Sequence, residues 1–110
     1  MTDPASPSTP TPRVYRVAEL LSGVRQLLED RVGTLWVCGE LSNLHRASSG
    51  HSYFSLKDDS AQVRAVLFRM AASRIPFEIE EGMEVLVQAQ VTVYEPRGDL
   101  QLIVRHIEPR

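Results

Sequence analysis

The sequence predicts an all-β protein with an added N-terminal helix, and three observations support this fold class. After residue 33, apolar and polar residues alternate at a period of two, which is typical of half-buried strands. Before residue 33, apolar residues recur at intervals of three and four, which indicates a helix with one apolar stripe. The chain of 110 residues, 43% hydrophobic and 24% charged, has the length and balance of one globular domain. We therefore expect one small barrel preceded by one helix.

The residues before the barrel fall into two parts. Residues 1–12 read MTDPASPSTPTP and lack side chains that build a core, so we expect a disordered tail. Residues 13–33 are expected to form a helix packed on the barrel, with Gly33 placed to end it. The apolar stripe of this helix consists of Val17, Leu20, Leu21, Val24, Leu27 and Leu28. A stripe of this kind needs a surface to cover, and the barrel is the expected one.

Five strands are expected within residues 34–110. The first contains Gly39 in its middle, where a strand can bend sharply. The strands cover residues 35–41, 53–57, 61–69, 84–94 and 100–107. Residues 70–81 break the alternation and are expected to hold a short helix or turn. This order predicts a five-stranded OB-fold barrel, in which the sheet closes on itself. An SH3-like barrel is the alternative, and the connector between the third and fourth strands favours the OB fold.

The sequence offers no set of residues for catalysis or metal binding. Cys38 is the only cysteine and is expected to be a small, buried apolar residue in a strand. The three histidines are scattered, and Asp58 and Asp59 lie together in a turn, so we expect no catalytic residue, metal or cofactor. No apolar run is long enough for a membrane span, and no signal peptide begins the chain. A cytoplasmic protein is therefore expected.

Basic, aromatic and amide side chains gather where OB barrels bind oligonucleotides, on the second and third strands and the two flanking loops. Because the net charge is −2, a binding prediction depends on the position of these residues, not on their number. The predicted nucleic-acid-binding residues are Asn43, His45, Arg46, His51, Tyr53, Lys57, Arg64, Phe68, Tyr94 and Arg97. Cations suit phosphates and flat rings suit unstacked bases, so single-stranded DNA is the predicted partner. Arg97 at a loop tip is the strongest candidate, Phe68 is equally compatible with the core, and Trp36 is expected beneath the helix.

Longer stretches of the chain resemble a known family. They are VYRVAELLSGVRQLLED, WVCGELSNLHRASSGHSYFSLKDDSAQVRAVLFR and VYEPRGDLQLIV, which together span nearly everything from Val14 to Pro109. They are similar to the N-terminal OB domain of the large subunit of bacterial exonuclease VII. The combination of GE-x-SN, SGH-x-YF-x-LKD and YEPRG is more specific than a general OB pattern. The Pro/Ser/Thr-rich leader is the one departure from that family.

This resemblance implies a single-stranded-DNA-binding domain that serves a nuclease. In that family a catalytic domain follows the OB domain, a helical region gathers several small subunits, and the holoenzyme degrades single-stranded DNA. The catalytic residues are therefore expected beyond Arg110, and the fragment itself is not expected to be an enzyme. An OB barrel that serves as a protein-interaction module is the alternative function, and the negative net charge supports it.

Overall fold

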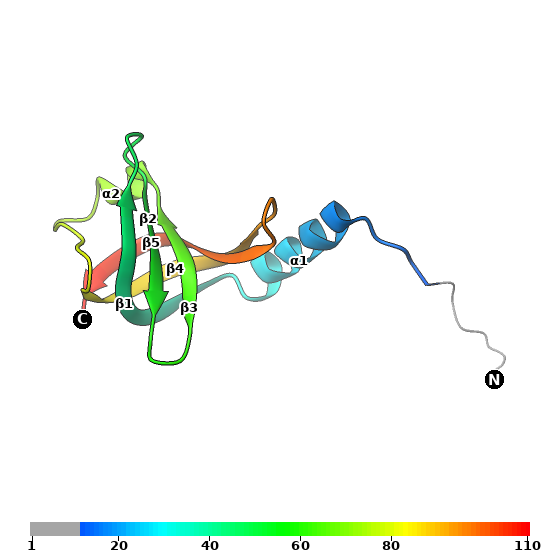
Figure 1. The fold of residues 1–110 in the computed structure, drawn as a ribbon, viewed down its shortest axis with the longest axis horizontal. Helices are drawn as coiled ribbons and strands as arrows, with labels where there is room; N and C mark the ends of the chain where they lie inside the picture. The colour runs from blue at the N-terminus through cyan, green and yellow to red at the C-terminus, as the bar shows by residue number, and fades with distance from the viewer. Residues whose placement is uncertain (1–11) are drawn as a thin grey trace.

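The computed structural model describes residues 12–110, which form five strands and two helices. The elements are α1 (Val17–Arg31), β1 (Thr34–Arg46), β2 (Ser52–Lys57), β3 (Gln62–Leu67), α2 (Arg69–Ala72), β4 (Glu84–Tyr94) and β5 (Asp99–Pro109). The strands close into a barrel in the order β1-β2-β3-β5-β4 (Figure 1). The predicted fold class is therefore confirmed, and the short connector helix lies between β3 and β4 as expected.

The long first strand allows the barrel to close. β1 pairs with β4 as far as Glu40 and with β2 from Glu40 onward. At Gly39, just before this change of partner, a Cβ atom would lie 2.8 Å from the carbonyl oxygen of Lys57 and 3.0 Å from Cγ of Leu56. Only glycine fits this close approach, which agrees with the bend expected there. The barrel is completed by a parallel pairing of β3 with β5 around Ala65 and Leu102.

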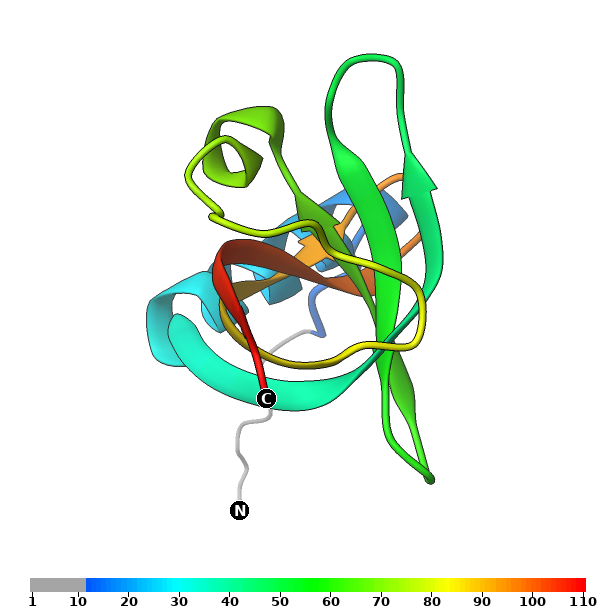
Figure 2. The same cartoon turned by 90° about the vertical axis from the view of Figure 1, so that its left-hand side faces the viewer.

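The core lies inside the barrel and follows the predicted alternation. Its buried residues are Leu41, Phe54, Leu56, Ala65, Leu67, Ile79, Val85, Val87, Ala89, Leu102, Val104 and Ile107. Residues of α2 and of the connector to β4, among them Ala72, Ile75 and Phe77, pack against this core. α2 and the β1–β2 loop lie at the same end of the barrel (Figures 1 and 2).

Two aromatic residues lie outside this core. Phe68 is 41% exposed, so its ring is not a core ring. Trp36, which was expected beneath the helix, is 53% exposed on the outer face of the barrel. There its ring centroid lies 6.0 Å from that of His106, edge to face. Trp36 pairs across the sheet with Gln88, and Gln88 pairs with His106, so these side chains share one face of β1, β4 and β5.

Helix α1 begins and ends where local interactions favour it. The backbone N–H of Arg16 donates to Oε1 of Glu19 at 2.9 Å, which satisfies a free donor at the start. Gly33 ends the helix as predicted, with a left-handed φ of 65° and its N–H donating to the carbonyl oxygen of Leu28 at 2.9 Å. The chain turns at Gly33 and enters β1, leaving α1 to project from the barrel beside β4 (Figure 1).

The packing of α1 differs from the expectation. None of its residues is buried, and only Leu21 and Leu28 of the apolar stripe are half-buried. The exposed members of the stripe are Val17, Leu20, Val24 and Leu27. The barrel is closed by its own strands and covered at one end by α2 and its connector, so it offers the helix no open apolar face. The helix therefore packs mainly against β4 and the β4–β5 turn, where Leu21 lies over Gly98.

The predicted division into tail, helix and OB domain remains a prediction. The tail expected at residues 1–12 lies outside the described residues except for Pro12, which is exposed. Within residues 12–110, no helix has the length and apolar character needed to cross a membrane.

Candidate nucleic-acid interface

A groove crosses the outer face of β2 and β3 and continues to the β4–β5 hairpin. Its more enclosed part is a hollow of about 340 Å³ lined by Tyr53, Arg64, Ala65, Tyr94, Arg97, Asp99, Leu100 and Gln101. Its second part, about 440 Å³, is lined by Asn43, Ser55, Gln62, Val63, Arg64, Asp99 and Leu100. Because Arg64, Asp99 and Leu100 line both parts, we treat them as one surface and call it the groove.

Strand register explains why these side chains meet. Ser55 of β2 pairs with Arg64 of β3, and Arg64 pairs in turn with Gln101 of β5. Residues paired in this way point to the same face of a sheet, so the three side chains form one row across the groove. Tyr53 lies two residues before Ser55 and points to the same face. The alternation along β2 and β3 thus places the ring of Tyr53 and the guanidinium of Arg64 on one surface.

The β4–β5 hairpin forms one wall of the groove. Tyr94 and Asp99 pair at its end, and the N–H groups of Arg97 and Gly98 donate to the carbonyl oxygen of Tyr94 at 3.2 and 2.9 Å. Gly98 has a φ of 71°, a left-handed conformation that favours glycine. The turn presents Tyr94 at 47% exposure, with Arg97 exposed beside it. Among residues 12–110, no carboxylate forms an ion pair with Arg64 or Arg97, so both guanidiniums are open to an anionic ligand.

At the other end, an irregular stretch of β1 places Asn43 in the groove. The pairing of β1 with β2 shifts between Ser42 and His45, and Asn43 adopts a φ of 54°. The carboxylate of Glu81 accepts hydrogen bonds from the backbone N–H groups of Leu44 at 2.9 Å and Asn43 at 3.0 Å. These two donors hold the pKa of Glu81 below its usual value, and the charge of Lys57 adds to this effect. Glu81 therefore fixes the irregular stretch.

Of the ten predicted residues, the groove brings together Asn43, Tyr53, Arg64, Tyr94 and Arg97. His45 is exposed and pairs across β1 and β2 with Tyr53, at the margin of the groove. Lys57 lines a separate hollow of about 150 Å³ together with Cys38. Cys38 lies in β1 as expected, but it is exposed and not buried, because its side chain points to the outer face of the barrel.

Arg46, His51 and Phe68 lie outside the groove, around the β1–β2 loop. A guanidinium N–H of Arg46 donates to the carbonyl oxygen of Ile79, and Glu78 lies 3.7 Å from the same group. His51 Nδ1 accepts from the N–H of Arg69 at 2.9 Å, and its ring lies edge-on to Phe68 with centroids 5.2 Å apart. These residues therefore hold the β1–β2 loop against α2 and its connector.

Seven residues line the groove that are not among the ten predicted, namely Ser55, Gln62, Val63, Ala65, Asp99, Leu100 and Gln101. Three of them belong to β5, which enters the groove because it pairs in parallel with β3. Alternation along a single strand carries no information about that pairing. Gln62 was identifiable, since it lies on the same face of β3 as Arg64.

The chemical groups of the groove suit a single-stranded nucleic acid. Two guanidiniums supply positive charge for phosphates, and two phenol rings supply surfaces for unstacked bases. The amides of Asn43, Gln62 and Gln101 add hydrogen-bond donors and acceptors for base edges.

Comparison with known proteins gives a family match and close relatives. Residues 15–108 match the family described as the OB-fold nucleic acid binding domain. The chain is 48% identical over 103 residues to an exodeoxyribonuclease 7 large subunit from Cronobacter sakazakii, covering 94% of this chain and 22% of that protein. It is 52% identical over 92 residues to the same subunit from Histophilus somni, covering 84% of this chain and 20% of that protein. The chain thus spans about a fifth of the length of these relatives.

Two solved structures are similar in fold. One is a replication protein A heterotrimer bound to single-stranded DNA, with a TM-score of 0.57 and 17% identity over 70% of this chain and 57% of that chain. The other is an asparaginyl-tRNA synthetase from Pyrococcus horikoshii, with a TM-score of 0.54 and 16% identity over 69% of this chain and 18% of that chain.

Proposed function

Because this chain belongs to the family of OB-fold nucleic-acid-binding domains, we propose that its groove binds single-stranded DNA without regard to sequence. The single observation that carries the proposal is the hollow in which Tyr53, Tyr94, Arg64 and Arg97 converge from three strands and a loop. The similarity to exodeoxyribonuclease 7 large subunits and to a single-stranded-DNA complex of replication protein A supports this choice of ligand.

Each kind of side chain has its own role in this proposal. Arg64 and Arg97 bind phosphates and release counterions, so they set how steeply affinity falls with salt. Tyr53 and Tyr94 stack on bases, and one such stack contributes roughly 1–3 kcal/mol for any base. Duplex DNA should bind more weakly than single-stranded DNA, because paired bases cannot present their faces to the rings.

The experiment is a titration of a fluorescent oligo-dT with the protein at several salt concentrations. Tyr53→Ala should weaken binding by roughly 1–3 kcal/mol while leaving the salt dependence nearly unchanged. Tyr15→Ala is the control for loss of an accessible tyrosine ring, because Tyr15 is 53% exposed and lies before α1 and outside the groove, whereas Tyr53 is half-buried. The stacking part of the proposal fails if Tyr53→Ala and Tyr15→Ala bind oligo-dT with equal affinity. It also fails if the protein binds duplex DNA as tightly as single-stranded DNA. Absence of any binding at low salt would instead favour a protein-interaction module.

We further propose that this domain delivers single-stranded DNA to a nuclease domain, as part of an exodeoxyribonuclease 7 large subunit in the cytoplasm. The small subunits of that enzyme are the proposed partners, through regions outside this chain. The similarity of about 50% to large subunits from several bacteria supports this proposal. In a full-length relative, the equivalent of Tyr53→Ala should raise the KM for single-stranded DNA, and an unchanged KM would contradict the delivery role.

A further inference from the structure

The tip of the β4–β5 hairpin extends past the rest of the barrel. β1 pairs with β4 only up to Gln90, and β3 pairs with β5 only at residues 101–103. The pairs Val93–Leu100 and Tyr94–Asp99 therefore have no third strand beside them. Because a two-stranded hairpin is only marginally stable in water, this tip needs support from another element. The tip carries Tyr94 and Arg97, so its support determines how one wall of the groove is presented.

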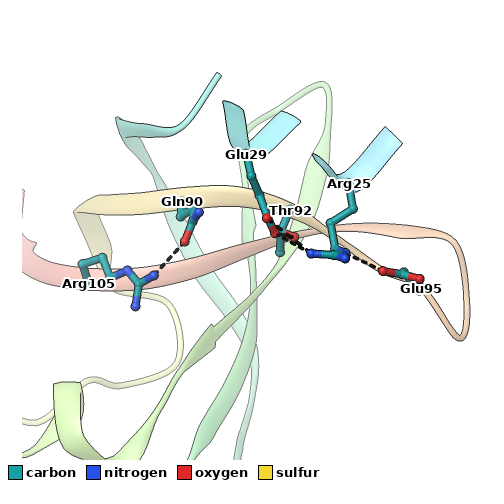
Figure 3. A network of polar contacts seen from close by, with 6 residues as sticks. All are labelled: Arg25, Glu29, Gln90, Thr92, Glu95 and Arg105. Atoms are coloured by element: carbon teal, nitrogen blue, oxygen red, sulfur yellow. Dashed lines mark hydrogen bonds and ion pairs between the residues drawn. The ribbon is translucent and has the colours of Figure 1, made fainter. Parts of the chain in front are cut away.

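Helix α1 makes a set of polar contacts with this hairpin (Figure 3). The guanidinium of Arg25 donates through Nε to the carboxylate of Glu95, the residue that directly follows Tyr94. The same guanidinium lies 3.3 Å from Oε1 of Glu29, one turn along the helix. Glu29 in turn accepts a hydrogen bond from the hydroxyl of Thr92 at 2.8 Å. The helix is thus joined to both the base and the tip of the hairpin.

Apolar packing lies beside these polar contacts. A Cβ atom built on Gly98 would lie 3.6 Å from Cδ2 of Leu21, so Leu21 packs over the turn at ordinary contact distance. Thr92 is 4% exposed and pairs with Gln101, which lines the groove. The helical face that contacts the hairpin therefore consists of Leu21, Arg25 and Glu29, at intervals of four residues.

We propose that α1 is a positioning element of the binding site, and that its Arg25–Glu95 ion pair holds the hairpin in the orientation that presents Tyr94 and Arg97 to DNA. This inference depends on the proposed function, because it concerns the same groove. Fixing the hairpin before the ligand arrives reduces the ordering cost of binding. Arg25, Glu29, Thr92 and Glu95 act through the hairpin and do not line the groove.

The charge of Glu95 makes this inference sharply testable. Glu95 is a negative charge on a loop that faces a polyanion. If it acted only through its charge, Glu95→Gln would tighten DNA binding by removing a repulsion. If it positions the hairpin, Glu95→Gln weakens binding, by about two- to fivefold, the range that one partly exposed ion pair can supply. The two explanations predict opposite signs.

The experiment measures oligo-dT affinity for wild type, Glu95→Gln, Glu95→Arg, Arg25→Glu and the exchanged pair Arg25→Glu with Glu95→Arg. Glu95→Gln should bind more weakly than wild type. The gain in affinity on adding Glu95→Arg to Arg25→Glu should exceed the change that Glu95→Arg alone causes in wild type, because only the exchanged pair restores the ion pair. Glu80→Gln is the matched control, since it removes the same charge from an exposed position in the connector between α2 and β4. Binding by Glu95→Gln that equals or exceeds that of Glu80→Gln overturns the inference.

A second measurement separates this inference from the proposed function. Hydrogen exchange of the Arg97 and Gly98 amides, both bonded to the Tyr94 carbonyl oxygen, reports on the hairpin without DNA. Exchange at these amides should be faster in Glu95→Gln than in wild type, while core amides such as that of Phe54 stay unchanged. Unchanged exchange at the turn overturns the positioning role. If wild type fails to bind oligo-dT while the turn amides still exchange faster in Glu95→Gln, the proposed DNA binding is overturned but the positioning of the hairpin by α1 is not.

Discussion

The two loops that flank the groove are both held by polar contacts away from it, but the elements that hold them differ. The β1–β2 loop is attached to α2 and its connector, through Arg46 to the Ile79 carbonyl and His51 to the Arg69 N–H. That connector also packs on the barrel core. The β4–β5 hairpin is attached to α1, a helix without a buried residue. The placement of the first loop is therefore coupled to global stability, whereas the second can change its placement while the barrel stays folded.

The largest expected difference concerns how much the residues that support each of the two loops contribute to the free energy of unfolding. Leu67 is 2% exposed and lies beneath the β1–β2 loop, where Arg46 and Ser52 line the same hollow. Leu67→Ala should cost about 2–5 kcal/mol of unfolding free energy, as for a buried leucine. Leu28 of α1 is only half-buried, so Leu28→Ala should cost about 1 kcal/mol. Urea denaturation measures both, and equal losses would show that α1 belongs to the cooperative core.

The turn glycines provide the second test of the comparison. Gly50 has a φ of 93°, and a Cβ there would lie 2.8 Å from Cδ of Arg69. Gly98 has a φ of 71°, with Leu21 at an ordinary distance of 3.6 Å from the added Cβ. Both alanine variants lose about 1 kcal/mol from backbone strain, and Gly50→Ala should lose up to about 2 kcal/mol because Arg69 must also move. Thermal unfolding of the pair measures the difference. A larger loss in Gly98→Ala would contradict the comparison.

The arginines of the two loops should differ in their effect on DNA binding. Arg97→Ala should weaken oligo-dT binding and flatten the slope of log affinity against log salt by roughly 0.7, the value for one lost phosphate contact on a single strand. Arg46 donates to the Ile79 carbonyl, so Arg46→Ala should leave the slope unchanged and lower the denaturation midpoint instead. The assignment of roles is wrong if Arg46→Ala flattens the slope as much as Arg97→Ala does.

The smallest expected effect is the pH dependence of stability that Glu81 contributes through its contacts with β1. Hydrogen bonds from Leu44 and Asn43 lower the folded-state pKa of Glu81 below 4.5, the value expected when the chain is unfolded. The stabilisation from Glu81 is therefore complete above pH 4.5 and is lost as the pH falls through the lowered folded-state pKa. Glu81→Gln should be less stable than wild type at neutral pH, and the difference should shrink in acid. The N–H groups of Ser60 and Ala61 also lower the pKa of Asp58. Because Asp58 is present in both proteins, its contribution to the pH dependence cancels in the stability difference between them. A constant difference across this range would exclude the titration of Glu81 as the cause.

The sequence predicts the barrel because each strand carries its own evidence in its alternation. It also predicts five groove residues. The alternation along β2 and β3 assigns Tyr53 and Arg64 to the outer face, and Tyr94 and Arg97 lie in or next to a recognisable turn. It does not reveal which cations are already paired within the protein. Arg46 and Arg97 are both loop arginines, and only the fold shows that a carbonyl 33 positions away holds Arg46. The parallel pairing of β3 with β5 is equally hidden, because it depends on how the sheet closes.

The helix shows a second limit of periodicity. The spacing of Leu20, Leu21, Val24 and Leu27 correctly indicates a helix, but it does not state which surface the stripe covers. Arg25 and Glu29, which make the polar contacts to the hairpin, fall among the residues that a hydrophobic pattern treats as solvent-facing. Their function depends on Glu95 and Thr92, more than sixty residues away in the chain.

The exposed position of Trp36 gives this protein a built-in optical reporter. Trp36 is the only tryptophan, and it lies beside His106 on a face of the barrel shared by β1, β4 and β5. It is not among the residues that line the groove. Its emission therefore records events on that other face, and a DNA strand confined to the groove leaves it unchanged. Quenching that appears only with longer oligonucleotides would measure how many nucleotides a strand needs to pass around the barrel.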